Sequence, residues 1–313
     1  MKLTKIATVL SLAVALAACP NKEKNASIEH MNAGVKALNS KQFESAKNAF
    51  EKAVASYRDN HSAHYYLGYA NAQRENWTAA VEGFEKAAQI KPEEPMYQLY
   101  LGVALYEKAL QVAREAAAKA QGKKPQEVEI DVSNLNYESA LQHLDAATKK
   151  NQELWRAHYF AGRIHRNKEN AQQAAESFTK AIQANPFEAA PYIALAELYR
   201  QWDYPDQAIQ VATIGTQQIP GAAEASNVWF VLGMGHNDKR QDDKAVEAFA
   251  KAIESRKDNH KAKFQRGQAL FRKGDYDKAK PDLEQFAKSG GQSADFEKAQ
   301  ANKMLMDIAA KQR

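Results

Sequence analysis

The sequence has little cysteine, glycine or proline, and each shortage excludes a class of protein. One cysteine in 313 residues cannot form an intramolecular disulfide, nor a structural zinc site built from several cysteines. Glycine and proline occur only 14 and 9 times, whereas alanine occurs 58 times. Because alanine is the strongest helix former and glycine and proline interrupt helices, this composition favours a mostly helical protein.

Strong charge of one sign is also missing. The formal net charge is +5, and the basic residues are interspersed with acidic ones. A nucleic-acid partner is therefore not expected. Near the amino terminus, Ile6–Ala18 is a stretch of 13 residues without a charged side chain. It is too short to span a bilayer, which takes about 20 apolar residues, but it suits a secretory signal.

The one cysteine lies directly after that stretch. Lys2 and Lys5 precede it, and Leu16-Ala17-Ala18-Cys19 resembles the lipobox of bacterial lipoproteins. The resemblance implies a signal peptide over 1–18, cleavage before Cys19, lipidation of Cys19 and a short tether over 19–26. Proline rather than aspartate at residue 20 implies an outer-membrane location, with the chain facing the periplasm. The alternative is an ordinary secretory signal followed by an incidental or buried cysteine.

A 34-residue period runs through the remaining sequence. Gly34, Gly68 and Gly102 are spaced by 34 residues. After the first two of them, an alanine, a phenylalanine and a second alanine follow at fixed offsets: Ala46, Phe50 and Ala53, then Ala80, Phe84 and Ala87. This pattern resembles the tetratricopeptide repeat (TPR), in which each repeat is a pair of antiparallel helices.

The resemblance implies an all-α, right-handed superhelix (an α-solenoid) of about seven helix pairs with a carboxy-terminal capping helix. The predicted repeats are 27–60, 61–94, 95–154, 155–188, 189–222, 226–259 and 260–293, and the cap is 294–313. In the cap, Phe296, Ala299, Met304, Leu305 and Ile308 are expected to face inward. The third repeat carries an insertion over about 110–136, expected to be helical over 110–120 and β-prone over 128–132.

In such a superhelix the first helix of each pair lines the concave groove, where a partner would bind. Its predicted apolar residues are Met31, Val35, Tyr65, Tyr69, Leu99 and Tyr106. A second group, Arg156, Tyr159, Arg163, Arg166 and Arg200, would suit a carboxylate or an acidic peptide. Two alternatives stay open: the tether or the insertion fills the groove, or the arginines are solvated and paired within the chain.

No pattern of catalytic residues is present. The sequence has no phosphate-binding loop, no Gly-x-Ser-x-Gly and no His-Glu-x-x-His. The pairs His61/His64 and His158/His165 lack a third ligand in frame, so no metal is expected. We therefore expect neither a cofactor nor enzymatic activity. An enzyme using the insertion as a lid remains the disfavoured alternative.

The lipobox and the continuous repeats together resemble outer-membrane TPR lipoproteins. That class includes pilotins, which assemble the type IV pilus secretin, and scaffolds for peptidoglycan-modifying enzymes. Unlike this chain, the pilotins have six repeats and no long insertion. The resemblance implies a membrane-anchored scaffold or adaptor whose groove binds envelope proteins or peptides. The alternative is a self-associating structural lipoprotein, a homo-oligomer in which residues 121–136 add a strand to a second copy.

Overall fold

The computed structural model describes residues 22–219, 221–289 and 295–312 and is built of α-helices. These residues contain no β-strand, so the all-α prediction is confirmed. Residues 1–18 and Cys19 lie outside the described residues. The helices are α1 (Lys22–Asn39), α2 (Phe43–Ser56), α3 (His61–Gln73), α4 (Trp77–Ile90), α5 (Pro95–Gln121), α6 (Glu138–Lys150), α7 (Trp155–Asn167), α8 (Ala171–Ala184), α9 (Ala189–Gln201), α10 (Pro205–Gln218), α11 (Ala222–Asp238), α12 (Asp242–Ser255), α13 (His260–Lys273), α14 (Tyr276–Ser289) and α15 (Asp295–Lys311), with a 3-10 turn at Pro125–Glu127.

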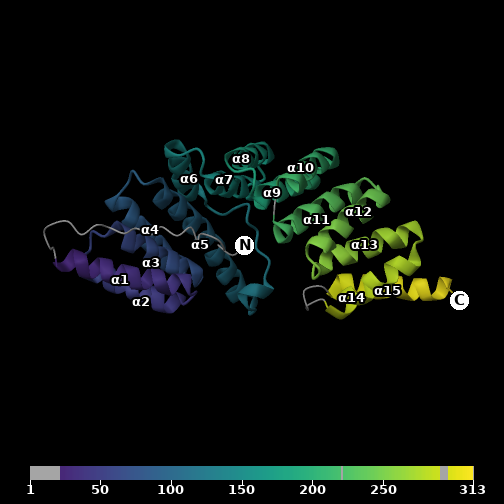
Figure 1. Cartoon of the computed structure of the whole chain (residues 1–313), viewed down its shortest axis with the longest axis horizontal. Coiled ribbons are helices and arrows are strands. Elements are labelled where there is room, and N and C mark those ends of the chain that lie inside the picture. Colours follow the sequence, from purple (N-terminus) through teal and green to yellow (C-terminus); the bar gives the residue numbers. More distant parts are fainter. Residues whose placement is uncertain (1–21, 220, 290–294, 313) are drawn as a thin grey trace. The chain divides into compact units, whose positions relative to one another are not determined.

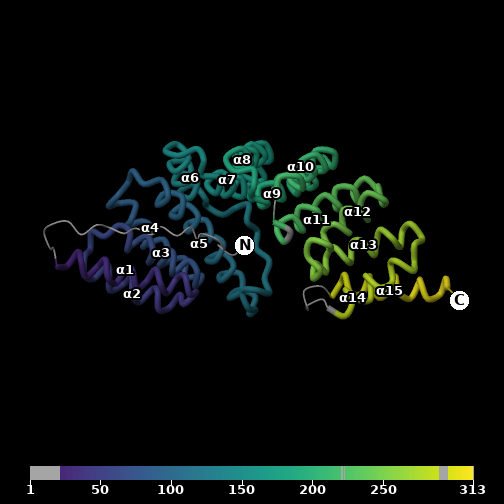
Figure 2. Tube along the Cα trace, viewed as in Figure 1, coloured from purple at the N-terminus to yellow at the C-terminus, as the bar shows by residue number. Residues whose placement is uncertain are grey.

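The chain divides into two compact halves, after Glu169. The N-terminal half holds α1 to α7 and the C-terminal half holds α8 to α15. Within each half, every helix packs against the next one along the chain, as Figures 1 and 2 show for α1 to α4 and for α11 to α14. None of the described helices is long and apolar enough to cross a membrane.

Small residues at fixed repeat positions allow this close stacking. Phe50 and Phe249 are fully buried at equivalent positions of the first and sixth repeats. A side chain on Gly34 would overlap the Phe50 ring, and one on Gly233 would overlap the Phe249 ring. Each glycine therefore leaves room for an aromatic ring between the two helices of its pair. The prediction that these phenylalanines are packing residues is confirmed.

In every repeat but the third, the turn between paired helices uses one left-handed residue at the same place. Its φ is 59° at Glu75, 61° at Asp203 and 82° at Gly274. The same angle recurs at the other turns, at Lys41, Glu169 and Arg240. In the third repeat this turn is absent, and α5 continues to Gln121 before Gly122 ends it with a φ of 63°. The insertion therefore begins as an extension of a first helix, as predicted for residues 110–120.

A buried serine–asparagine contact links the beginning of a repeat to its end in the first and sixth repeats. The Ser27 hydroxyl donates to the Ala53 carbonyl at 2.6 Å and accepts from the Asn60 side chain at 2.8 Å. In the sixth repeat, Ser226 donates to the carbonyl of Ala252 at 2.7 Å and accepts from Asn259 at 3.0 Å. Both asparagines also cap the next helix, accepting from Ala63 or Ala262 at 3.0 Å. One motif thus joins three consecutive helices in each half.

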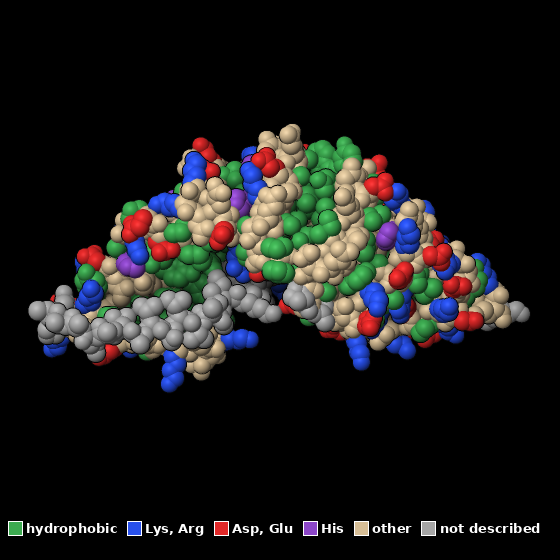
Figure 3. Space-filling model, turned by 45° about the horizontal axis from the view of Figure 1, so that its top comes forward, with side chains coloured by type: hydrophobic (Ala, Val, Ile, Leu, Met, Phe, Trp, Pro, Cys, Tyr) green, Lys and Arg blue, Asp and Glu red, His purple; other side chains and the backbone are tan. Residues whose placement is uncertain are grey.

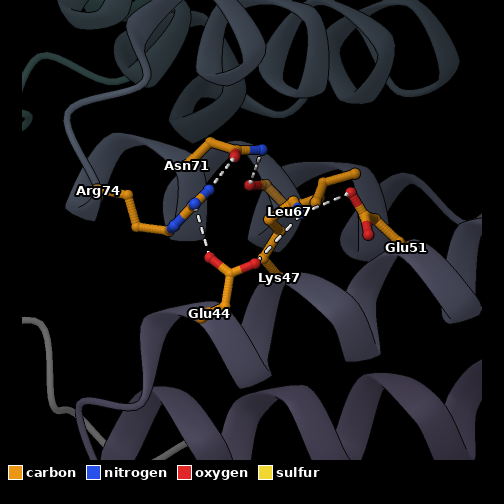
Figure 4. Close-up of polar contacts among 6 residues, drawn as sticks. All are labelled: Glu44, Lys47, Glu51, Leu67, Asn71 and Arg74. Atoms are coloured by element: carbon orange, nitrogen blue, oxygen red, sulfur yellow. Dashed lines mark hydrogen bonds and ion pairs between the residues drawn. The ribbon is translucent and has the colours of Figure 1, made fainter.

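Ion pairs connect the end of a first helix to the start of the preceding second helix. Arg74 after α3 lies 2.6 Å from Glu44 at the start of α2, and Lys47 bridges Glu44 and Glu51 (Figure 4). Arg74 also donates to Asn71, whose amide donates to the Leu67 carbonyl at 3.1 Å. In the C-terminal half, Arg272 pairs with Asp242 at 2.6 Å in the corresponding way. These pairs also complement the helix dipoles.

Three sequence predictions need correction at the ends of the repeats. The first helix begins at Lys22, inside the predicted tether of 19–26. The capping helix is present as α15, but Phe296 and Ala299 are exposed, and the buried residues of this helix are Ala301 and Ile308. The stretch 128–132 forms no strand. Val128 is instead buried, and the carbonyl of Val132 accepts a hydrogen bond from the Tyr137 hydroxyl at 3.1 Å.

Candidate functional site

A cluster of tyrosines lies where α3 and α5 pack beside each other. Residues four apart on α3 (Tyr65, Tyr69) and three apart on α5 (Tyr97, Tyr100) share a helix face. The Tyr65 ring lies 5.2 Å from Tyr97 and 5.4 Å from Tyr100, measured between centroids, and Tyr69 lies 6.1 Å from Tyr100. We call these four residues the tyrosine cluster.

Tyr100 is the deepest member of the tyrosine cluster. Its side chain is 2% exposed, and its hydroxyl has no hydrogen bond of normal geometry. The neighbouring Tyr65 hydroxyl interacts with it without reaching that geometry. Burial raises the pKa of Tyr100 to about 12. One turn beyond Tyr69, the buried amide nitrogen of Gln73 also lacks a partner.

Arg156 supplies positive charge beside this cluster. It is half-buried in the first turn of α7, a helix that contacts α5, and its guanidinium lies 4.4 Å from the centroid of the Trp155 ring. Its charge opposes the burial effect on the pKa of both Tyr100 and Tyr69. Among the described residues, no carboxylate lies within ion-pair distance of Arg156. The site therefore combines a cation with hydrogen-bond donors that are not engaged.

In the C-terminal part of α7, the polar side chains Arg163 and Asn167 have partners within the chain. Arg163 lies 3.4 Å from Glu107 and stacks 4.9 Å from the centroid of the Tyr106 ring. Asn167 donates to the hydroxyls of Tyr106 and Tyr137, both at 3.2 Å. Tyr137 is the N-cap residue of α6, directly after the inserted segment, and its ring lies 5.5 Å from that of Tyr106.

Burial separates the predicted groove residues into two groups. Leu99, Tyr106 and Tyr159 are 2%, 2% and 7% exposed, so the expectation that they form an open surface is wrong. Tyr106 is covered by Tyr137 and Arg163, and Tyr159 packs against Trp155 and Phe160. Met31 and Val35 are half-buried against the cluster around Phe50. Tyr65 and Tyr69 are half-buried and belong to the tyrosine cluster.

The predicted arginines do not form one group. Arg156, Arg163 and Arg166 are on α7, and the charges of Arg163 and Arg166 both lower the pKa of Tyr106 against the raising effect of burial. Arg200 belongs to the other half and makes a bidentate pair with Asp238, at 2.5 and 3.0 Å. For Arg163 and Arg200, the alternative of partners within the chain is therefore the one observed.

The sequence pattern missed three residues that shape these sites. Tyr100 stands at a packing position of its repeat, and repeat position alone does not reveal a hydroxyl without a partner. Glu107 and Asp238 lie 56 and 38 residues from the arginines they neutralise. Both are acidic residues of a first helix, Glu107 in the middle of α5 and Asp238 at the end of α11, and this is the signal that could have identified them.

The surface offers binding chemistry rather than a metal centre. The described residues contain no group of three histidine, cysteine, aspartate or glutamate side chains placed to hold a metal ion. On the face shown in Figure 3, lysine and arginine side chains are interspersed with aspartate and glutamate. The distinctive feature is the set of aromatic rings around Tyr100, of which Tyr65 and Tyr69 are half-buried.

Comparison with known proteins agrees with this helical architecture. The C-terminal part of a TPR repeat-containing protein from Cytophaga hutchinsonii is similar in structure with a TM-score of 0.58 at 17% identity, covering 80% of this chain and 89% of that one. PilF of Pseudomonas aeruginosa has a TM-score of 0.56 at 17% identity, with coverage of 79% and 97%. A TPR protein from Parabacteroides merdae has a TM-score of 0.56 at 12% identity, with coverage of 91% and 99%.

At these identities the likeness establishes the fold alone. No curated protein matches the sequence. The family match rests instead on the sequence itself, over residues 32–95, 130–189, 230–294 and 264–302. These ranges cover more than half of the chain and include six of the seven repeats predicted from the 34-residue period, in whole or in part. The chain belongs to the tetratricopeptide repeat family.

Proposed function

We propose that this protein is a non-catalytic scaffold or adaptor that binds partner proteins through the first helices of its N-terminal repeats. The observation that carries the proposal is the tyrosine cluster with Arg156 beside it. Native proteins leave few buried polar groups without partners, and a donor left unused inside a folded protein is costly. Tyr65 and Tyr69 are half-buried, and the exposed parts of their rings would supply contact area to a bound partner.

The proposal extends to the cell envelope on the strength of the sequence from Met1 to Cys19. We propose that Cys19 is lipidated and anchors the chain to the outer membrane on its periplasmic side, where the repeats bind proteins of an envelope assembly. A pilotin-like role in assembling a type IV pilus secretin is one specific form of this proposal, and a scaffold for peptidoglycan-modifying enzymes is another. The structural likeness to PilF supports the shared fold and leaves the partner to experiment.

Affinity capture with crosslinking from envelope fractions tests the binding role. We expect wild-type protein to recover defined partners and Tyr69→Ala to lose them, while helical content and melting stay close to wild type. Tyr204→Ala is the matched control, because Tyr204 is 51% exposed and belongs to the other half. Recovery of the same partners by Tyr69→Ala would refute the proposed surface, and recovery of only the chain itself would favour self-association.

Fractionation tests the proposed anchor separately. Cys19→Ser removes the thiol that lipidation requires, so we expect the protein to leave the outer-membrane fraction and appear in the soluble fraction. Metabolic labelling with a palmitate analogue should mark wild type and not the variant. Equal recovery of both proteins with the outer membrane would show that Cys19 is not the anchor, whatever the repeats bind.

A further inference from the structure

The last helix of the stack, α15, has an apolar outer face. Its inner face packs beside α14 (Figure 1) through Ala301 and Ile308, which are 0% and 1% exposed. On the outer face, Phe296 is 73% exposed and Met306 is 74% exposed, the two highest values among the large apolar side chains of the described residues. The end of a repeat stack requires a polar outer face to stay soluble. The apolar face of α15 therefore indicates that another surface covers it.

The first described helix, α1, has the polar outer face that α15 lacks. Its exposed residues include no large apolar side chain: Lys22, Glu23, Lys24, Glu29, Asn32, Ala33, Lys36 and Asn39. On α15, five exposed residues instead follow one another at intervals of three or four: Phe296, Ala299, Lys303, Met306 and Ala310. Residues at these intervals lie along one side of a helix. We call these five residues the α15 row.

Contacts with the start of α14 fix the last turn of α15. The Lys311 ammonium donates to the Tyr276 hydroxyl at 2.7 Å and lies 5.5 Å from the centroid of the Phe271 ring. The Gln312 amide donates to the Asp277 carboxylate at 2.7 Å. The α15 row is therefore presented by a helix that is already in place, so that covering it costs little ordering.

The α15 row is complementary to itself when its direction is reversed. Lys303 is its middle member, so two copies of α15 that meet antiparallel at Lys303 place Phe296 of one copy against Ala310 of the other. Met306 then lies close to Ala299, so that each large side chain faces a small one. The same arrangement brings Asp295, in the acidic first turn, to Lys311, in the basic last turn. A parallel arrangement would instead place like charges and like ends of the helix dipoles together.

We propose that α15 is the contact surface between two copies of this chain, which pair antiparallel about a two-fold axis at Lys303. Both copies contribute the α15 row, as a two-fold interface requires. One helix from each copy buries less than the about 1,600 Å² of a standard interface, so we expect a dissociation constant of about 10–100 µM. The two Lys303 ammonium groups meet at the axis, where their repulsion weakens the pair. This inference is independent of the partner-binding surface proposed above.

Sedimentation velocity of the 313-residue chain over a range of concentrations tests the pairing. All samples carry Cys19→Ser, which removes the one native thiol and its proposed lipidation. We expect the sedimentation coefficient to rise with concentration toward that of a dimer. Met306→Glu should weaken the association at least about tenfold, because it places a carboxylate in an apolar contact. Val112→Glu is the matched control, since Val112 on α5 is 54% exposed and gains the same charge.

Two further variants test the contact on either side of Met306. Phe296→Ala should weaken the association about tenfold, and Lys303→Ala should strengthen it about threefold by removing the repulsion at the axis. Phe296, Lys303 and Met306 are all exposed in a single copy. Well below the dissociation constant, the variants should therefore match the parent chain in helical content and melting, which separates lost pairing from unfolding.

Disulfide crosslinking tests the orientation of the pair. In the antiparallel arrangement Lys303→Cys meets its own copy at the axis, and a disulfide requires Cα atoms within about 7 Å of each other. Asp295→Cys is eight residues from the axis, so its two copies lie about 24 Å apart along the helices. We expect mild oxidation to link Lys303→Cys into covalent dimers and to leave Asp295→Cys monomeric.

Four outcomes would overturn the proposal. A parent chain that is monomeric at every concentration would refute the pairing, and equal crosslinking of the two cysteine variants would refute its orientation. Association that survives in Met306→Glu would place the contact elsewhere, such as at residues 121–136. A monomeric chain that loses captured envelope partners in Met306→Glu would show that a different protein covers α15. Each outcome leaves the partner-binding surface of the first helices to its own test with Tyr69→Ala.

Discussion

The two halves of the molecule share their packing but differ in how their polar groups are satisfied. Phe50 and Phe249 fill the same space in the two halves, and Ser27 and Ser226 make the same buried contacts. On the N-terminal half, Tyr100 and Gln73 keep buried polar atoms without partners. In the described residues of the C-terminal half, no buried side-chain nitrogen or oxygen lacks one.

We use this difference to choose the half of the molecule in which the partner-binding surface is proposed. Packing residues recur because every repeat must stack on its neighbours, so they are alike in both halves. In the C-terminal half, Arg200 and Arg266 make bidentate pairs with Asp238 and Asp282. The N-terminal half leaves Arg156 without a carboxylate. The half with unmet polar groups is therefore the one that we assign to partner binding.

The largest effect should come from the packing residues, and it should be the same in both halves. Phe50→Ala and Phe249→Ala each remove a fully buried ring. We expect each to lower the free energy of unfolding by about 3–5 kcal/mol, through lost apolar burial and the cavity left behind. Chemical denaturation followed by circular dichroism measures this. Phe296→Ala is the control, because Phe296 is 73% exposed and should change stability by less than about 0.5 kcal/mol.

Clearly different losses of unfolding free energy in Phe50→Ala and Phe249→Ala would contradict the statement that the two halves share their packing. If only one of them destabilised the protein, the two rings would not be equivalent in the stack. The two halves would then differ in packing as well as in polar pairing.

The serine contacts should give the next largest effect, again alike in both halves. Ser27→Ala and Ser226→Ala each remove a donor to a buried carbonyl and an acceptor for an asparagine amide. Groups left without partners inside the protein cost about 1–3 kcal/mol. Melting curves should show similar losses for the two variants. Ser56→Ala is the control, because the Ser56 hydroxyl bonds only to Lys52 within its own exposed helix turn, and it should stay near wild type.

The repeat period predicted the backbone well because stacking constrains the same positions every time. Gly34 and Gly233 could be identified from spacing alone, since any side chain there collides with a ring. The long α5 could be predicted from its alanine-rich extension. The turn residues could not, because five of the six left-handed positions carry lysine, glutamate, aspartate or arginine rather than glycine.

The candidate site was harder to predict because it depends on which side chains meet across repeats. Periodicity placed Tyr65, Tyr69 and Arg156 on the groove but also placed Leu99, Tyr106 and Tyr159 there, which the structure buries. Whether an arginine is paired depends on a carboxylate far away in sequence, such as Asp238 for Arg200. Whether the Tyr100 hydroxyl finds a hydrogen-bond partner depends on all the side chains around it, and these come from several helices. No sequence pattern shows this.

Two tyrosine variants sharpen the contrast between unmet and satisfied polar groups. Tyr100→Phe removes a hydroxyl without a partner, so we expect stability to rise by about 1 kcal/mol. Tyr106→Phe removes a hydroxyl that accepts from Asn167, so we expect stability to fall by about 1 kcal/mol. Both rings are 2% exposed, which makes each variant the control for the other. Thermal melts with the same sign for both would contradict our account of Tyr100.

The smallest effect should come from the ion pairs that neutralise the groove arginines. Arg200 holds Asp238 through two bonds, whereas Arg163 holds Glu107 through one contact of 3.4 Å and also stacks on Tyr106. All four side chains are partly exposed, so each pair should contribute about 0.2–1 kcal/mol at low salt. A double-mutant cycle on each pair, with the arginine and the acid changed to glutamine or asparagine, isolates its coupling energy.

We expect the Arg200–Asp238 coupling to be the larger of the two, because its bidentate geometry fixes both groups. Raising the ionic strength from about 0.01 M to about 1 M shortens the screening length from about 30 Å to about 3 Å, so both couplings should shrink. If the coupling energy of Arg163–Glu107 were the larger, the ion pairs of the N-terminal half would be at least as strong as those of the C-terminal half. The contrast would then rest on Tyr100, Gln73 and Arg156 alone.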